Sequence, residues 1–456
     1  MTFDASVDVL VVGGGGGGLV AALSAAAPGL EIAVIEKSHR IGGNTALSSG
    51  SVPGAGTRFQ REAGIDDCAD LFAADITRRT GGTAPAHLVR RLAEESAPLV
   101  EWLVDEVRVP LRLVPDLRKV GHSVPRTHAP PGREGTQVVD ALEAAATAAG
   151  VMISPGHALE SLVADDGGDV VGVVVRHDGA TLSIGARRVI LAANGFAGNR
   201  AMLARYAPEV AAAPYFGHPD NTGDGIGAAL ALGANVVNMA AYQGHASVSD
   251  PHGALMSWTA IERGGYLVNS DGERFTNETL GYSGCAAEVL RQPDRRAFVV
   301  IDGRTDGYMR ANVPDFVAID GYGGVRRGAT LREAAAGLDI GARRLDVTHE
   351  AYQAAARAGT GDPFGRADFG QAPLEPPFAI VRVTAGLFHT QGGLDIDEDA
   401  RVRRPDGSVI GNLYAVGGTA VGVSGSDGGR GYCSANGLLA ALGLGRIAGA
   451  HAGLSL

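Results

Sequence analysis

The chain has 456 residues and a formal net charge of -11 at neutral pH. This acidic balance argues against nucleic acid or an anionic membrane as a partner, because either would need a local basic patch and none stands out. Cys68, Cys285 and Cys433 are too far apart for a disulfide framework or a zinc site, so we expect no metal and three small buried side chains.

A strand predicted at residues 7–12 begins too close to Met1 to leave room for a signal peptide. No apolar run appears long enough to cross a bilayer. The sequence therefore predicts a cytoplasmic protein without a membrane span, and the length predicts roughly two or three domains.

Consecutive glycines at positions 13–18 follow that strand, and a small-residue helix and a second strand follow the glycines. Gly13, Gly15 and Gly18 fit the pattern G-x-G-x-x-G, which provides a tight turn, close backbone approach to a pyrophosphate and a helix N-terminus that favours negative charge. Glu36 ends the second strand, where its carboxylate can accept hydrogen bonds from a ribose 2′-OH. The order of these elements predicts a dinucleotide-binding unit rather than a flexible glycine linker.

Residues 37–51 are rich in glycine and hydroxyl groups and include Gly42, Gly43, Asn44 and Thr45. This segment resembles the flavin-contacting GGNT…S-x-G segment of the FAD-dependent fumarate reductase and succinate dehydrogenase flavoprotein superfamily. The resemblance implies an α/β fold: a Rossmann-like FAD-binding domain, with a parallel sheet and a β-meander, and an inserted α+β substrate cap domain. Asn44 stands where membrane-bound members carry a flavin-linking histidine, which implies non-covalent FAD.

The fingerprint and the resemblance together imply one set of FAD-binding residues along the chain. They are Gly13, Gly15, Gly17, Gly18, Glu36, Lys37, Gly42, Gly43, Asn44, Thr45, Ser49, Gly50, Ala193, Asn194, Gly195, Asn221, Asp224, Gly417, Ser434, Asn436 and Leu438.

Between these segments, a 3.6-residue apolar period predicts helices within residues 66–107 and at 135–149. His122, Arg126 and His128 lie in the loop between them and could line a site, although a loop stabilised by its own side chains is favoured for at least two of them. Alternating β-branched residues at 151–193 predict a β-meander that returns to the parallel sheet. Thr222 or Asp224 is expected to cap the next helix.

Residues 243–388 lack the nucleotide fingerprint and a run of parallel strands, so we interpret them as the cap domain, with residues 1–242 and 389–456 forming the FAD-binding domain. A buried strand at 411–418 and a helix of small and apolar residues at 435–449 are expected near the C-terminus. The helix would point its N-terminus at the flavin.

The proton that accompanies hydride transfer needs a protein group to carry it. Fumarate reductases use an arginine in a segment like N-E-x-x-x-R, together with an upstream glutamate and arginine. Here the segment carries Tyr282 in the arginine's place, Arg263 matches the upstream arginine, and Ala260 occupies the glutamate's position. Two of the three relay members are therefore missing.

A tyrosine at that spacing resembles the 3-ketosteroid dehydrogenases of the same superfamily, whose tyrosine takes the α-proton of the substrate. Tyr432 and Ser434 match a second tyrosine and a serine of those enzymes, so the resemblance implies Tyr282 and Tyr432 as catalytic residues. For Tyr432 a purely structural role is about as well supported. For Tyr282 the alternative is a buried tyrosine hydrogen-bonded for structure.

The segments around His245 and His389 resemble the substrate-binding histidines of fumarate reductases, and Arg430 lies within two residues of the position of their carboxylate-binding arginine. A guanidinium and an imidazole that converge are suited to a carboxylate. Structural alternatives are a surface ion pair for Arg430, an orienting role for His389 and a strand-end role for His245. The substrate-binding candidates are thus His389, Arg430, Ser434, His245 and Arg263.

Three functions follow as hypotheses. The first is an FAD-dependent dehydrogenase that introduces a C=C bond beside a ketone, with a monocyclic oxo-carboxylic acid or a 3-ketosteroid as substrate. The second is a fumarate-reductase-like ene-reductase or dehydrogenase of small di- or tricarboxylates. The third is a non-catalytic flavin-binding protein. The sequence leaves the electron acceptor and the oligomeric state open.

Overall fold

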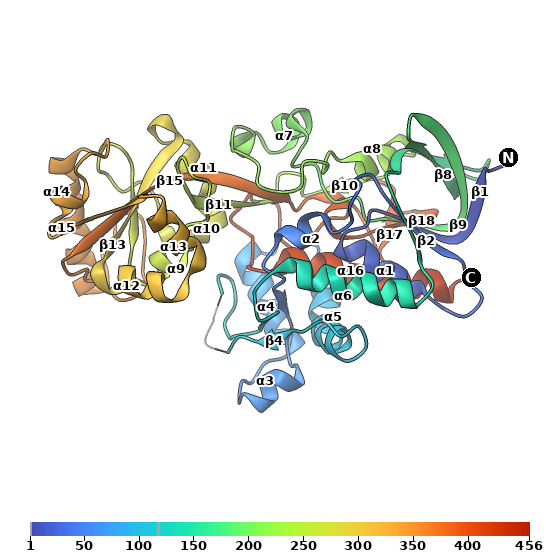
Figure 1. Cartoon of the computed structure of the whole chain (residues 1–456), viewed down its shortest axis with the longest axis horizontal. Coiled ribbons are helices and arrows are strands. Elements are labelled where there is room, and N and C mark those ends of the chain that lie inside the picture. Colours follow the sequence, from blue (N-terminus) through green and yellow to red (C-terminus); the bar gives the residue numbers. More distant parts are fainter. Residues whose placement is uncertain (1, 116–118) are drawn as a thin grey trace. The chain divides into compact units, whose positions relative to one another are not determined.

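The computed structural model describes residues 2–115 and 119–456 (Figure 1). Contacts divide the chain into two units. The nucleotide unit comprises residues 1–207, 217–242 and 389–456, and the cap unit comprises residues 208–216 and 243–388.

The nucleotide unit is built on a sheet with the strand order β17-β18-β9-β1-β2-β6. β1 is parallel to β2 and β9, β18 is parallel to β9, and β6 is parallel to β2. The last four residues of β1 are all buried, because a parallel strand covered on both faces needs a continuous apolar run. The strands are β1 (Ala5–Val12), β2 (Ile32–Glu36), β6 (Met152–Pro155), β9 (Ala180–Leu191), β17 (Arg401–Arg403) and β18 (Val409–Ala415).

β7 (Ala158–Ala164) and β8 (Val170–His177) form an antiparallel meander that joins the sheet at β9. The α/β fold class and the β-meander predicted from the sequence are therefore confirmed. A three-stranded β3-β5-β4 sheet and a β10-β16 pair complete the strands described in this unit; these are β3 (Val52–Pro53), β4 (Arg112–Leu113), β5 (Thr127–Ala129), β10 (Val236–Val237) and β16 (Gly393–Leu394).

α1 (Gly16–Ala25) packs along α16 (Asn436–Leu454), and α6 (Gly135–Ala148) packs against α1 (Figure 1). Glycines allow the close approach: a Cβ atom added at Gly445 would lie 2.5 Å from the carbonyl oxygen of Gly17. The predicted helices within residues 66–107 are confirmed as α4 (Ala69–Thr80) and α5 (Ala86–Asp105). The remaining helices of the unit are α2 (Gly43–Leu47), α3 (Arg58–Glu62), α7 (Arg200–Tyr206) and α8 (Asp224–Ala231).

Two expectations are corrected here. α16 is long and apolar enough to cross a membrane, contrary to the expectation from the sequence, but 56% of its apolar window is buried inside the protein, as in a core helix. Cys68 is exposed, whereas Cys285 and Cys433 are buried. Cys68 directly precedes α4 as its N-cap residue, at the surface end of the helix.

The cap unit contains a sheet with the order β11-β15-β13-β12, and β14 pairs with β15. β13 pairs antiparallel with both β12 and β15. The strands are β11 (Tyr242–Ser249), β12 (Tyr266–Val268), β13 (Arg296–Asp302), β14 (Val325–Gly328) and β15 (Phe378–Thr390). The helices are α9 (Thr259–Glu262), α10 (Gly281–Gly284), α11 (Ala286–Leu290), α12 (Gly303–Asn312), α13 (Pro314–Gly321), α14 (Leu331–Ala334) and α15 (Ala342–Ala358).

Candidate active site

The turn between β1 and α1 has the geometry that a dinucleotide needs. Gly13 has a φ of 116°, in the region that favours glycine, and a Cβ atom added at Gly18 would overlap the carbonyl oxygen of Gly13. At Gly15, an added Cβ atom would meet only the Gly42 carbonyl oxygen, at 3.8 Å. The backbone at Gly15 is thus open to a ligand, beside the N-terminus of α1.

Glu36 lies next to this turn. Its carboxylate accepts hydrogen bonds from the backbone N–H groups of Gly14 and Ser38, each at 2.8 Å. These two bonds hold the carboxylate in place and leave lone pairs for ribose hydroxyl groups.

Lys37 and Asp224, both predicted to bind the cofactor, are bonded to each other. The Lys37 ammonium lies 2.7 Å from the Asp224 carboxylate and 2.8 Å from the Thr222 hydroxyl. The expected helix cap at Thr222 or Asp224 is wrong, because Gly223 is the N-cap of α8 and no side chain caps this helix. Both candidate side chains instead accept hydrogen bonds from the Lys37 ammonium.

The glycine- and hydroxyl-rich segment at residues 37–51 contains the short helix α2, and its polar side chains form hydrogen bonds with other parts of the unit. The Thr45 hydroxyl accepts a bond from the Gly16 N–H at 3.2 Å. The Asn44 amide oxygen accepts bonds from the His218 N–H at 2.6 Å and from the Asn221 side chain at 3.1 Å. The structure thus brings the two predicted asparagines, 44 and 221, together.

Asn194 follows β9 and has a φ of 63°. Its amide oxygen accepts the Gly195 N–H at 2.8 Å, and its carbonyl oxygen accepts the Thr419 hydroxyl at 2.9 Å. A Cβ atom added at Gly418 would collide with that amide oxygen. The side chain of Asn194 therefore fills the space beside Gly418.

Asn436, the first residue of α16, is fully buried, yet neither polar atom of its amide has a hydrogen-bond partner. Buried amides are rarely left unsatisfied in native proteins. Together with the open backbone at Gly15, this orphaned amide fits a bound FAD, which would supply the missing partners.

His389 and Tyr432 meet at the N-terminal turn of α16. Their rings are edge-to-face, with centroids 5.8 Å apart. A Cβ atom added at Gly437 would lie 2.9 Å from His389 Nε2 and 3.5 Å from Tyr432 Oη. A phenol and an imidazole therefore converge on the same backbone position of α16.

Gln391, which the sequence analysis missed, orients His389. Its amide nitrogen lies 2.9 Å from His389 Nδ1, which also lies 3.3 Å from the Thr390 carbonyl oxygen, and its amide oxygen accepts the Ser424 hydroxyl at 2.9 Å. Burial lowers the pKa of His389 to about 4, so the ring is neutral at pH 7. The position of Gln391, two residues after a candidate histidine, is the only signal in the sequence for this role.

Arg430 is about half exposed, and its guanidinium lies 3.9 Å from the carboxylate of Asp427. This ion pair is loose and solvent-screened. Ser434 is buried in the segment that leads into α16. The binding roles of both residues stay predictions.

In the cap unit, a buried ion pair fixes the segment before Tyr282. The Glu278 carboxylate binds Arg274 at 2.6 Å, lies 3.4 Å from Arg366 and accepts the Leu267 N–H at 3.1 Å. Glu278 of the N-E-x-x-x-Y segment therefore anchors the short helix α10, which carries Tyr282.

Tyr282 stacks on His245. Their ring centroids are 4.7 Å apart with an interplanar angle of 19°. The Gly244 N–H donates to the Ser283 hydroxyl at 3.0 Å, which ties β11 to α10. His245 Nδ1 accepts the Ser247 N–H at 3.2 Å.

Arg263 has partners elsewhere in the cap unit. Its guanidinium donates to the Gln371 amide oxygen at 2.9 Å and lies 3.9 Å above the Tyr308 ring. These contacts anchor it to the scaffold of the unit.

Three buried imidazoles predict a pH dependence of stability. Burial lowers the pKa of His122, His128 and His389 to about 4, from an ordinary value of 6.5. Because each imidazole binds fewer protons when folded than when unfolded between these values, its stabilising contribution is complete above pH 6.5 and is lost as the pH falls towards 4. We expect a loss of roughly 3 kcal/mol per imidazole. Urea unfolding at pH values between 6.5 and 4 measures this loss. A free energy of unfolding that stays constant over that range would contradict the claim that these imidazoles are buried in the neutral form.

The sequence matches the model of the FAD binding domain family over residues 8–434. The chain belongs to this family. A probable fumarate reductase of Shewanella frigidimarina is 31% identical over 457 residues, covering 97% of this chain and 74% of the relative. NADH:fumarate oxidoreductase of Klebsiella pneumoniae is 30% identical over 428 residues, covering 92% of this chain, and the chain spans only 45% of the length of that relative.

Among solved structures, 3-ketosteroid-delta4-(5alpha)-dehydrogenase from Rhodococcus jostii, in complex with 4-androstene-3,17-dione, superposes with a TM-score of 0.79 at 27% identity. The match covers 99% of this chain and 98% of that chain. The predicted superfamily and the FAD cofactor are thereby confirmed. The protein is an FAD-dependent oxidoreductase of the ene-reductase and dehydrogenase class, acting on CH–CH groups.

Proposed function

We propose that this FAD-binding protein is a dehydrogenase that introduces a C=C bond beside a ketone carbonyl. The observation that carries the proposal is Tyr282, which stands where fumarate reductases are expected to have arginine and lies face to face with His245. The structural similarity to a 3-ketosteroid dehydrogenase supports it.

The roles of the side chains follow from chemistry. Tyr282 removes the proton from the carbon next to the carbonyl group. Tyr432 and backbone N–H groups at the start of α16 bind the carbonyl oxygen and stabilise the negative charge that develops on it. FAD, bound non-covalently in keeping with Asn44 at the position of the linking histidine, supplies the hydride acceptor.

The substrate that we favour is a monocyclic oxo-carboxylic acid, with a 3-ketosteroid as the alternative. Arg430 supplies a cation for the carboxylate. His389, neutral at pH 7, supplies a hydrogen bond from Nε2 in the tautomer in which Nδ1 accepts from Gln391.

Replacing Arg430 should separate these two substrates. We expect Arg430→Ala to raise KM for an oxo-acid about tenfold or more, with kcat little changed, because the ion pair is the same in the ground state and the transition state. KM for an uncharged cyclic ketone is the matched control and should not change. An unaltered KM for the oxo-acid would contradict the carboxylate assignment.

The second candidate is an ene-reductase or dehydrogenase of small di- or tricarboxylates, favoured by the fumarate reductase among the relatives. Steady-state turnover with an artificial electron acceptor distinguishes the two. Formation of an unsaturated ketone supports the dehydrogenase. If ketones give no product while fumarate-like acids reoxidise the reduced protein, the second candidate is correct.

A non-catalytic flavin-binding protein would do neither. The cytoplasmic location stays a prediction, and the identity of the electron acceptor stays open.

A further inference from the structure

We propose that His122 is a positioning residue, whose imidazole fixes the peptide bond between Ser434 and Ala435 and so places Tyr432 and the first turn of α16. The inference rests on the proposed role of Tyr432 in the reaction. The sequence left open whether His122 lines a site or stabilises its own loop, and this inference gives it a third role.

The segment that leads into α16 needs an external constraint. Ala435, the N-cap of α16, has a φ of 69° and a ψ of -3°. This left-handed conformation costs a residue with a side chain about 1 kcal/mol. The cost persists only where the surroundings determine the backbone.

The loop supplies that constraint on consecutive residues. The Ser434 N–H donates to the Val120 carbonyl oxygen at 3.0 Å, and His122 Nε2 lies 2.8 Å from the Ser434 carbonyl oxygen. Cys433 packs against Gly121, which lies between Val120 and His122, because a Cβ atom added at Gly121 would lie 2.7 Å from the Cys433 sulfur. The loop therefore holds Ser434 from its N–H to its carbonyl group.

The direction of the His122 bond follows from its other partner. His122 Nδ1 lies 3.2 Å from a terminal nitrogen of Arg126, and a guanidinium can only donate hydrogen bonds. Nδ1 must therefore accept, and the ring proton lies on Nε2, where it is donated to the Ser434 carbonyl oxygen. Burial also lowers the pKa of His122 to about 4, which keeps the ring neutral and this arrangement intact.

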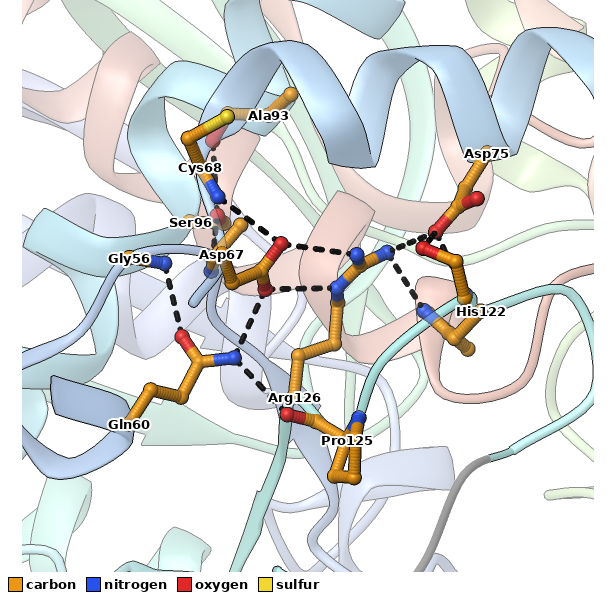
Figure 2. A network of polar contacts seen from close by, with 12 residues as sticks. Gly56, Gln60, Asp67, Cys68, Asp75, Ala93, Ser96, His122, Pro125 and Arg126 are labelled. Carbon is orange, nitrogen blue, oxygen red and sulfur yellow. Dashed lines mark hydrogen bonds and ion pairs between the residues drawn. The ribbon is translucent and has the colours of Figure 1, made fainter. Parts of the chain in front are cut away.

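Arg126 is itself held rigidly (Figure 2). Its guanidinium forms a two-pronged bond with Asp67, at 3.0 Å for each contact, and a third bond with Asp75 at 2.7 Å. The side chains of all three residues in these ion pairs are fully buried. Asp75 lies on α4, so a continuous set of bonds runs from α4 through Arg126 and His122 to Ser434.

Tyr432 is held from the same side. Arg79 of α4 donates to its carbonyl oxygen at 3.3 Å. The backbone of Tyr432 is thus fixed by α4, and the backbone of Ser434, two residues later, is fixed by His122. Together these bonds place the phenol of Tyr432. A shift of about 1 Å in a catalytic group can cost about 100-fold in rate.

The experiment compares His122→Leu, which removes both bonds, with His122→Gln, whose side-chain amide can still donate to Ser434 and accept from Arg126. We expect His122→Leu to lower kcat about 100-fold per bound flavin and to accelerate amide hydrogen exchange at residues 432–438. His122→Gln should restore both to within a few-fold of the original protein.

His128 is the matched control. It is also buried, with the same lowered pKa, but it bonds Thr57 and the Arg126 carbonyl oxygen, at 3.1 Å each. His128→Leu should lower stability and leave kcat per flavin and exchange at residues 432–438 unchanged. Equal effects of the two leucine variants, or no change of exchange in His122→Leu, would overturn the inference.

Gly121→Ala keeps the test decisive if His122→Leu does not fold. The added methyl group meets the Cys433 sulfur, and the φ of 88° at Gly121 disfavours alanine, so the loop must move away from Cys433 and Ser434 and the same acceleration of exchange is expected; unchanged exchange would overturn the inference. Hydrogen exchange needs no substrate. A protein that oxidises no ketone, yet shows the exchange pattern, would contradict the proposed function and leave the positioning role supported.

Discussion

Tyr282→Phe is expected to lower kcat by about 10²- to 10⁴-fold, because the phenol oxygen is the group that removes the α-proton. The substitution keeps the ring, so the stack on His245 at 4.7 Å should persist. FAD content and the melting temperature should stay close to those of the original protein. Single-turnover reduction of the flavin by a ketone measures the effect without interference from reoxidation.

Another tyrosine of the cap unit provides the control for this variant. Tyr308 lies in the same unit and stacks beneath Arg263, and it has no assigned role in the chemistry. Tyr308→Phe should leave the rate of flavin reduction unchanged. If the flavin of Tyr282→Phe were reduced as fast as that of the original protein, a group other than the Tyr282 phenol would have to remove the α-proton.

Gly18→Ala should abolish FAD binding or weaken it by at least about 100-fold. A methyl group at this position overlaps the carbonyl oxygen of Gly13, so the turn from β1 into α1 must open and its N–H groups no longer converge on the pyrophosphate. Flavin fluorescence titration of the apoprotein measures the affinity. Since bound FAD stabilises only the folded chain, the melting temperature should also fall.

Gly227→Ala is the matched control for the glycine turn. Gly227 lies within α8, and a Cβ atom added there meets nothing within 4 Å. Alanine is favoured over glycine inside a helix by about 1 kcal/mol. This variant should bind FAD normally and be equally or more stable. Normal FAD binding by Gly18→Ala as well would show that the turn does not carry the diphosphate.

The fold could be predicted in large part because its strongest signals are local. A single βαβ unit has a geometry that follows from a few residues. Here these are the run from Val9 to Val12, the glycines after it and Glu36 at the end of β2. Helix periodicity identified α4, α5 and α6 for the same reason. The length of α16 was underestimated, because a helix was expected at residues 435–449 and the helix continues to Leu454.

Other features depended on side-chain partners far away in the sequence. The expected cap of α8 is wrong because Gly223, which has no side chain, occupies the N-cap position, and Thr222 and Asp224 on either side of it bind Lys37 instead. Gln391 and His122 contact His389 and Ser434. The sequence analysis missed Gln391, and it pointed to His122 without indicating its contact with Ser434. The partners of Lys37, Gln391 and His122 are tertiary contacts, which periodicity and motif spacing do not encode.

Anaerobic mixing of the oxidised protein with ketones and with saturated carboxylic acids tests the central claim most directly. We predict that a cyclic ketone, and more strongly an oxo-acid, bleaches the flavin absorbance and yields the unsaturated ketone, while saturated acids without a ketone leave the absorbance unchanged. Bleaching by saturated acids alone, or by none of these compounds, would contradict the account.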